Sequence, residues 1–298
     1  MPLIMIWQNM EEYNKSLYGL VGYPLGHSLS PLMHNAAFDA LGVDAVYKLF
    51  PLQEGELEPF FKDLKDEESP IFGLNVTVPY KEKVVRFLDN VDPLVDKIKA
   101  VNTIFINDKR KLVGYNTDAP GFLAHLSELG FATDEKSVAI IGAGGAARAI
   151  ISVLCLIVER PKSIKIYDID KGKAEFLVKD ISENINIDIV ETVNSIDDLN
   201  IESSELLINA TPIGMKEKDP CLVEEGLLHS GMLVYDLIYN PAETELLRLA
   251  REKGAQVSNG LGMLYYQGVL AFQRWAEQEI DQKIKNIMRK ALEKGLGL

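Results

Sequence analysis

Cysteine is scarce in this sequence, which limits both disulfide bonds and cysteine-ligated metal sites. Only Cys155 and Cys221 are present among 298 residues, and neither stands in a CxxC pair or beside ligand-spaced histidines. A disulfide framework and a zinc site are therefore not supported, and we expect no metal ion. We predict a reduced, cytoplasmic protein.

Long apolar runs and basic runs are also missing. No stretch reaches the roughly 18 apolar residues of a membrane span, and the apolar residues 1–7 lack the length and basic flank of a signal peptide. The chain has 44 acidic and 31 basic side chains, which gives a net charge of −13. Because nonspecific nucleic-acid binding depends on Lys and Arg at the phosphates, we expect neither nucleic acid nor a membrane as partner.

The remaining composition is that of a globular protein, with 47% hydrophobic and 25% charged residues. At about 150 residues per domain, the length predicts two domains. From Leu17 onward strand-like and helix-like segments alternate, which is typical of an α/β fold with parallel strands.

The first half of the chain is predicted to hold strands at 17–22, 45–50 and 71–76, helices at 31–41 and 57–64, a hairpin of 101–106 with 112–115, and a helix at 120–129. The helix at 31–41 has the clearest signals: Ser30 as N-cap, Pro31 at its first position and Gly42 after its end. A second series of strands is predicted at 138–141, 164–167, 187–190, 206–209 and 233–236, with helices between them. From Leu261 the tail is predicted to be helical.

A glycine motif opens the second series. Residues 138–147, VAIIGAGGAA, pass from an apolar strand into G-x-G-x-x-A at the head of an apolar helix. Gly142 permits the tight turn, Gly144 lets the backbone approach a pyrophosphate, and Ala147 lets the helix pack closely on the strand. The sequence therefore predicts a dinucleotide site, with a purely structural glycine turn as the alternative.

Asp168 ends the next predicted strand, about 20 residues after the motif. A carboxylate there accepts hydrogen bonds from ribose hydroxyls and repels a 2′-phosphate, so NAD is favoured over NADP. Two alternatives stay open: Asp168 could merely cap the turn into the next helix, and Arg148 could still reach a 2′-phosphate.

Four polar clusters stand at predicted strand ends and turns. They contain Ser28 and Ser30 in GHSLSP, Thr77 and Lys81 in NVTVPYK, Asn102 in AVNT, and Asn116 and Asp118 in GYNTD. Two hydroxyls at a helix N-terminus suit a carboxylate. Each cluster taken singly is explained better by caps, turns or a solvated charge than by a binding site.

Taken together, these clusters are the residues by which the chain resembles the shikimate dehydrogenases. The matching motifs, in the order of that family, are GYPLGHSLSPLMHN from Gly22, NVTVPYK from Asn75, Asn102-Thr103, Asn116-Thr117-Asp118, GAGGA from Gly142, NATPIGM from Asn209, Tyr239-Asn240-Pro241 with Thr244, and NGLGM from Asn259 with Gln267. The resemblance implies an N-terminal α/β substrate domain, residues 1–118 completed by C-terminal helices 261–298. It also implies a C-terminal Rossmann dinucleotide-binding domain at 119–260.

The resemblance further implies the reversible NAD(P)-dependent reduction of 3-dehydroshikimate to shikimate, in the shikimate pathway of aromatic amino-acid biosynthesis. It makes Lys81 the acid/base with Asp118 as its partner. It assigns the substrate carboxylate to Ser28, Ser30 and Tyr239, and the ring hydroxyls to Thr77, Asn102, Asp118 and Gln267. The implied cofactor contacts are Gly142, Ala143, Gly144, Gly145, Ala146, Asp168, Asp170, Thr211, Leu237, Gly260 and Met263.

One motif departs from the family pattern. NADP-using members carry Asn-Arg-Thr or Asn-Arg-Ser at the end of the second Rossmann strand, where this chain has Asp168-Ile169-Asp170. The departure favours NAD, keeps NADP possible, and leaves an NAD-dependent quinate/shikimate dehydrogenase as the alternative. A remoter alternative is a noncatalytic dinucleotide-binding sensor, which would not need Lys81 and Asp118. The expected partners are small molecules, shikimate, 3-dehydroshikimate or quinate, with the chain acting as a monomer or homodimer.

Overall fold

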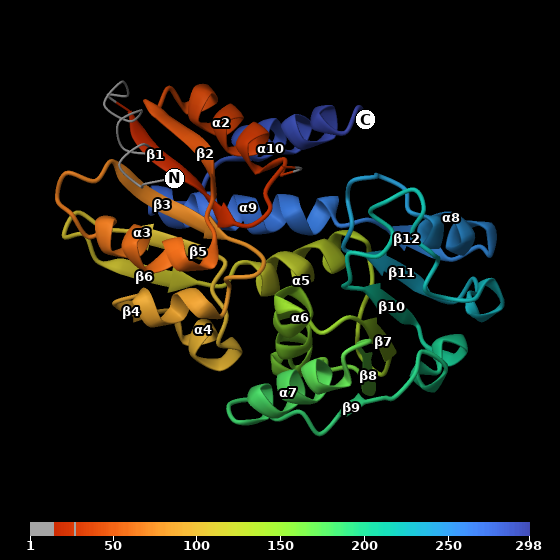
Figure 1. The fold of residues 1–298 in the computed structure, drawn as a ribbon. Helices are drawn as coiled ribbons and strands as arrows, with labels where there is room; N and C mark the ends of the chain where they lie inside the picture. The colour runs from red at the N-terminus through yellow and green to blue at the C-terminus, as the bar shows by residue number, and fades with distance from the viewer. Residues whose placement is uncertain (1–14, 27) are drawn as a thin grey trace. The chain divides into compact units, whose positions relative to one another are not determined.

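Two six-stranded sheets organise the part of the chain that the computed structural model describes, residues 15–26 and 28–298. The apolar residues 1–7 considered above lie outside the described residues. Unit 1 runs to Thr117 and takes up Gly268–Leu298, and unit 2 is Asp118–Gln267 (Figure 1). The sequence predicts domain divisions after residues 118 and 260, whereas the two units divide after Thr117 and Gln267. The predicted α/β fold class is confirmed.

The sheet of unit 1 is mixed, with the strand order β2-β1-β3-β5-β6-β4. Its strands are β1 (Ser16–Gly22), β2 (Ala45–Pro51), β3 (Ile71–Val76), β4 (Asn90–Val91), β5 (Thr103–Ile106) and β6 (Leu112–Tyr115). The first three strands run parallel, while β5 is antiparallel to both β3 and β6, as the predicted hairpin requires. Because Asn75 near the end of β3 pairs with Thr103 at the start of β5, residues after β3 and residues before β5 share one sheet edge.

Alternating side chains give this sheet two different faces. The helices of the unit are α2 (Ser30–Leu41), α3 (Leu57–Asp63), α4 (Pro93–Ile98), the end of α9 (Leu261–Ala276) and α10 (Gln282–Gly295), with short 3-10 turns η1 (Glu54–Glu56) and η2 (Lys83–Phe87). Leu17 and Val21 of β1 pack with α3, η2 and α4. On the other face Tyr18 and Tyr47 pack against Trp275 of α9. α10 in turn lies beside α2 (Figure 1).

The start of α2 differs from the prediction. Leu29 is the N-cap residue and makes no side-chain cap bond, while the Ser28 Oγ accepts the Ser30 N–H at 3.3 Å. Ser30 is the first helical residue; it is buried and shares a hydrogen bond with the Tyr47 hydroxyl. The predicted N-cap role of Ser30 is therefore wrong, because its side chain reaches β2 and not the helix backbone. Gly42 ends the helix as predicted, with a φ of +66°.

The sheet of unit 2 is parallel throughout, in the order β12-β11-β10-β7-β8-β9. Its strands are β7 (Ser137–Ile141), β8 (Ser163–Tyr167), β9 (Val190–Thr192), β10 (Leu206–Asn209), β11 (Leu233–Asp236) and β12 (Gln256–Ser258). Its helices are α5 (Asp118–Glu128), α6 (Gly145–Leu156), α7 (Lys171–Ser182), α8 (Glu245–Glu252) and the start of α9, with 3-10 turns η3 (Asp197–Leu199), η4 (Ile201–Ser203) and η5 (Glu225–Leu227). The strand order reverses between β7 and β10, which is the switch point of a doubly wound Rossmann fold. The predicted Rossmann domain is confirmed.

One strand of unit 2 was predicted in the wrong place. The sequence predicts a strand at 187–190, whereas β9 is Val190–Thr192. The Val190 N–H donates to the Ile187 carbonyl at 2.9 Å, so residues 187–190 form a turn that precedes the strand. An apolar run alone cannot distinguish the turn from the strand.

No helix in residues 15–26 and 28–298 is long and apolar enough to cross a bilayer. Within the same residues, no group of three His, Cys, Asp or Glu side chains is arranged to hold a metal ion. Cys155 and Cys221 are both free thiols.

Candidate active site

The predicted substrate residues of unit 1 gather at one edge of its sheet. Ser28 and Ser30 follow β1, Thr77 and Lys81 follow β3, and Asn102 directly precedes β5. Because β1 and β3 are parallel neighbours and β5 begins where β3 ends, all three connections meet at this edge. The edge therefore presents hydroxyl, amide and ammonium groups together, which suits a small polyhydroxylated acid.

Buried amide side chains hold this edge together. The Asn75 Nδ2 donates to the Asn102 carbonyl and to Thr103 Oγ1, both at 3.1 Å. The Asn102 Oδ1 accepts the Thr117 N–H at 2.7 Å, and its Nδ2 donates to Thr117 Oγ1 at 2.9 Å. The orientation of Asn102 is thus set by the residue that immediately precedes Asp118 in the chain.

Tyr47 belongs to this cluster and was missed from the sequence. Its hydroxyl donates to the Asn75 Oδ1 at 2.8 Å and also hydrogen-bonds Ser30. Burial raises the pKa of Tyr47 well above its ordinary value, so the hydroxyl keeps its proton and remains a donor. A lone tyrosine on the inward-facing side of an apolar strand was the available signal.

The backbone around Lys81 is fixed by contacts with other parts of unit 1. Tyr80 is buried, and its hydroxyl donates to the Leu52 carbonyl at 2.8 Å. The Val101 N–H donates to the Lys81 carbonyl at 2.8 Å. These contacts anchor the main chain on both sides, while the Lys81 side chain is half-buried. A half-buried lysine at a strand end is suitably placed for proton transfer to a bound ligand.

In unit 2 the glycine loop joins β7 to α6 at the switch point. Gly142 has a φ of +104°, and a Cβ on it would lie 2.8 Å from the Ala210 carbonyl. Gly144 has open space beside its Cα, while Ala147 is fully buried in the first turn of α6. No side chain within the described residues caps this helix. The loop and the N–H groups of the first turn therefore fit the pyrophosphate of a dinucleotide.

Asp168 lies at the end of β8 and is tied to the glycine loop. Its Oδ2 accepts the Ala143 N–H at 2.8 Å, and its Oδ1 accepts the Asp170 N–H at 2.9 Å. The helix α7 is capped by Asp170, whose Oδ1 accepts the Lys173 N–H at 3.3 Å. Asp168 thus caps the turn into α7 and Asp170 caps the helix itself, while Asp168 keeps further lone pairs that can meet ribose hydroxyls.

Arg148 pairs with a carboxylate of its own unit, and not with the site of a 2′-phosphate. Its side chain is only 2% exposed, and its Nη1 forms an ion pair with Asp180 Oδ2 of α7 at 2.5 Å. A guanidinium held against α7 is not placed to receive a 2′-phosphate, so the Arg148 alternative is not supported.

The loop from β11 to α8 carries Leu237 and Tyr239 and is anchored by a buried carboxylate. Asp236 accepts the Ile238 N–H and the Asn209 Nδ2, both at 3.0 Å. The Thr244 hydroxyl donates to the other oxygen of Asp236 at 2.7 Å. Because Asp236 is fully buried, its pKa is raised. One carboxylate thus holds both ends of the loop, a role that the sequence did not reveal.

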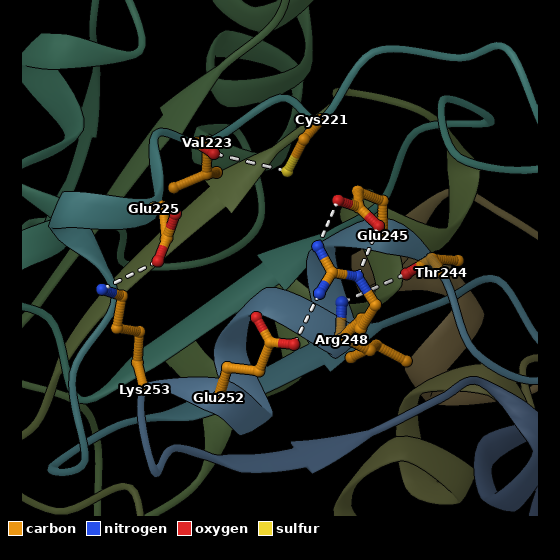
Figure 2. A network of polar contacts seen from close by, with 9 residues as sticks. Cys221, Val223, Glu225, Thr244, Glu245, Arg248, Glu252 and Lys253 are labelled. Carbon is orange, nitrogen blue, oxygen red and sulfur yellow. Dashed lines mark hydrogen bonds and ion pairs between the residues drawn. The ribbon is translucent and has the colours of Figure 1, made fainter.

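Thr244 is also the N-cap residue of α8, and Figure 2 shows it beside Arg248 of that helix. The guanidinium of Arg248 lies between the carboxylates of Glu245 and Glu252 (Figure 2). A cavity of about 460 Å³ adjoins this region, lined by residues that include Met215, Cys221 and Thr244. The anchored loop thus forms part of a concave surface of unit 2.

The other predicted residues of unit 2 lie at the same carboxyl edge of its sheet. They are Thr211 after β10, Leu237 and Tyr239 after β11, and Gly260, Met263 and Gln267 after β12. Gly260 packs directly on the Leu237 carbonyl, which leaves no room for a side chain. Asp118 is the first residue of α5 and is 5% exposed. The structure thus places Lys81 in unit 1 and Asp118 in unit 2.

Known proteins are similar to this chain over most of its length. The model of the shikimate dehydrogenase substrate binding domain matches residues 20–104. The shikimate dehydrogenase (NADP(+)) of Geobacillus kaustophilus is 41% identical over 286 residues, which cover 93% of this chain and 99% of that protein.

Solved structures are similar over nearly the same length. The shikimate 5-dehydrogenase of Listeria monocytogenes, in complex with shikimate and NAD, has a TM-score of 0.80 at 34% identity, covering 92% of this chain and 96% of that one. The quinate dehydrogenase of Corynebacterium glutamicum, in complex with NAD, has a TM-score of 0.84 at 30% identity, covering 94% and 99%. Because identity, coverage and fold agree, this chain belongs to the shikimate dehydrogenase family.

Proposed function

We propose that this protein is a shikimate dehydrogenase, an oxidoreductase that interconverts 3-dehydroshikimate and shikimate with a nicotinamide dinucleotide. The observation that carries the proposal is the 41% identity to the Geobacillus enzyme over 93% of the chain. The presence of Lys81 and Asp118 supports catalysis over a sensor role. The corresponding place is the shikimate pathway of aromatic amino-acid biosynthesis, in the cytoplasm, with the chain as a monomer or homodimer.

The two units divide the binding work in this proposal. Unit 1 supplies the substrate residues Ser28, Ser30, Thr77 and Asn102, which is supported by the match of its residues 20–104 to a substrate-binding domain, and unit 2 adds Asp118, Tyr239 and Gln267. Unit 2 binds the dinucleotide, which is supported by the glycine loop at its switch point. The substrate carboxylate is held by Ser28, Ser30 and Tyr239, and the ring hydroxyls by Thr77, Asn102, Asp118 and Gln267.

The chemistry needs one proton donor at the reacting oxygen. A bound nicotinamide dinucleotide supplies hydride for reduction and accepts it for oxidation. Lys81 donates a proton to the carbonyl oxygen in reduction and withdraws it from the hydroxyl in oxidation, with Asp118 as its partner. Hydrogen bonds to the ring hydroxyls fix the ring, so that the reacting carbon is presented in one orientation.

We propose NAD as the preferred nucleotide, with NADP as the alternative. Asp168 lies against the glycine loop and Asp170 stands two residues on, so a 2′-phosphate would meet negative charge. The buried ion pair with Asp180 engages Arg148, the one nearby guanidinium that the sequence offered. Relatives are named with either nucleotide: NADP(+) for the Geobacillus enzyme and NAD for the Listeria complex.

Steady-state kinetics with shikimate or quinate, each with NAD or NADP, test these assignments. We expect the highest kcat/KM with shikimate and NAD. A higher kcat/KM for quinate with NAD would favour the quinate/shikimate alternative, for which the similar Corynebacterium structure is a precedent. A higher value with NADP would overturn the cofactor proposal, and no turnover in any combination would overturn the proposed activity.

The role of Lys81 is tested by Lys81→Ala. We expect kcat to fall at least about 100-fold, because a positioned general acid or base contributes a factor of this size. The affinity for NAD, measured by calorimetry, should stay within about twofold. The control is Lys83→Ala, which removes an exposed lysine that pairs with Glu54 at 2.6 Å. Equal turnover of the two variants would show that Lys81 does not transfer the proton.

A further inference from the structure

His125 joins three elements of unit 2 that carry proposed site residues. It lies in α5, two helical turns after Asp118, so the two side chains share a face of that helix. It is 7% exposed, and its Nδ1 lies 2.5 Å from the hydroxyl oxygen of Tyr235 in β11. The ring also lies directly over the Cα of Gly262, in the first turn of α9, where a Cβ would collide with it.

Tyr235 has a proton to donate in this hydrogen bond. Its side chain is fully buried, and burial raises its pKa above the ordinary range, so the hydroxyl keeps its proton. The Met263 N–H donates to the Tyr235 oxygen. The hydroxyl proton is therefore available to the His125 Nδ1, which accepts it in the tautomer that carries the ring proton on Nε2.

A second close contact joins α5 to α9. A Cβ on Gly121 would lie 2.8 Å from the Gln267 nitrogen and 3.1 Å from its Cα. Gly121 precedes His125 in α5, whereas Gln267 follows Gly262 in α9, so the helices pack closely in antiparallel directions. Both contacts depend on glycine, which lets a backbone approach that any larger residue would prevent.

We propose that His125 is a positioning residue for the dehydrogenase reaction. Through the Tyr235 hydroxyl and the Gly262 contact, it fixes α5, β11 and the start of α9 relative to one another. These elements carry Asp118, the loop with Leu237, and Gln267. The inference rests on the proposed function, because it assumes that those residues bind or process the substrate.

The test compares variants that remove or keep the acceptor. Tyr235→Phe removes one oxygen and keeps the ring packing with Phe122, whereas His125→Leu removes the acceptor. His125→Asn keeps an oxygen that can accept from the Tyr235 hydroxyl. Gly262→Ala displaces the His125 ring, and Gly226→Ala is its control, because a Cβ at Gly226 would meet nothing within 4 Å.

We expect Tyr235→Phe, His125→Leu and Gly262→Ala each to lower kcat for shikimate oxidation at least about tenfold, because small displacements of positioned groups have effects of this order. The kcat of the double variant should be no lower than the lower kcat of the two single variants, because both substitutions remove the same Tyr235–His125 hydrogen bond, and Tyr235→Phe already includes the loss of the Met263 N–H acceptor. His125→Asn should stay within about threefold of wild type, and Gly226→Ala should match it. The affinity for ADP, measured by calorimetry, should remain within about twofold in every variant.

Wild-type kcat in Tyr235→Phe or His125→Leu would overturn the inference. The inference would also be overturned if the losses of kcat multiplied in the double variant. It would be overturned as well if His125→Asn lowered kcat as much as His125→Leu. A parallel loss of ADP affinity and kcat would indicate general damage to unit 2 and also count against positioning. If the wild type turned over neither shikimate nor quinate, the proposed function would fail, and the positioning role would fail with it.

Discussion

Ile169 is an exposed residue between the two carboxylates on which the proposed choice of nucleotide depends. Both oxygens of Asp168 accept backbone N–H groups, which holds its charge beside the glycine loop. Asp170 is committed to capping α7. Ile169, 93% exposed between them, is the position at which a side chain can change without loss of either role. The proposed preference for NAD thus depends on a fixed negative charge and on a residue 169 that carries no positive charge.

Ile169→Arg should shift the preference toward NADP. A guanidinium at this exposed position can pair with a 2′-phosphate and offset the charge of the flanking acids. We expect the ratio of kcat/KM for NADP to that for NAD to rise about tenfold or more, measured by initial rates with shikimate saturating.

The control for this variant is Val158→Arg. It introduces the same charge at a 99% exposed residue just after α6, on the far side of unit 2 from the carboxyl edge of the sheet. An equal change of the ratio in both variants would mean that overall charge, and not the site, accounts for it. No change in Ile169→Arg would show that residue 169 does not face the ribose.

At the scale of helices and strands, the sequence best predicted the features that depend on residues close together in the chain. The glycine loop and the helix after it were found because each residue of the motif has its own backbone requirement. The role of Ser30 in α2 was predicted wrongly because its partner Tyr47 lies on β2, a separate element. Asp236 was missed as an anchor because its partners Asn209 and Thr244 come from separate connections. Contacts between distant segments leave no periodic signal in one sequence.

The Tyr47 hydroxyl ties three elements together, and Tyr47→Phe tests its importance. The variant leaves buried Asn75 without its donor and Ser30 without a partner on β2. We expect the free energy of unfolding to fall by about 1–3 kcal/mol. We also expect KM for shikimate to rise several-fold with a smaller change in kcat, because Ser30 is proposed to bind the carboxylate in the ground state.

Tyr18→Phe provides the comparison for that measurement. It removes a hydroxyl from the same aromatic cluster, where Tyr18 packs 5.2 Å from Trp275, but it leaves the bonds of Ser30 and Asn75 in place. If Tyr47→Phe and Tyr18→Phe raised KM equally, the hydroxyl of Tyr47 would have no specific role in placing Ser30.

The stability of the whole molecule depends on pH through a fully buried histidine, because this side chain affects the free energy of unfolding. The ring of His34 is enclosed between the rings of Tyr47 and Trp275, with centroid separations of 4.5 Å and 5.0 Å. Neither nitrogen of the His34 ring has a hydrogen-bond partner within the described residues. Burial lowers the pKa of His34 from 6.5 to about 3. Between these values the unfolded chain binds a proton that the folded chain does not, so stability falls as the pH falls below 6.5.

His34→Phe should remove this dependence. The linkage predicts that His34 makes wild type lose about 2 kcal/mol of unfolding free energy between pH 7 and pH 5, and that the variant is spared this loss. Asp236, whose pKa burial raises, acts in the opposite direction, but it is common to both proteins and cancels in the difference. Urea unfolding followed by circular dichroism at the two pH values measures it, with Tyr18→Phe as a control in the same aromatic cluster. Equal losses in wild type and His34→Phe would place the acid sensitivity in other groups, because a phenylalanine cannot bind the proton that opposes folding.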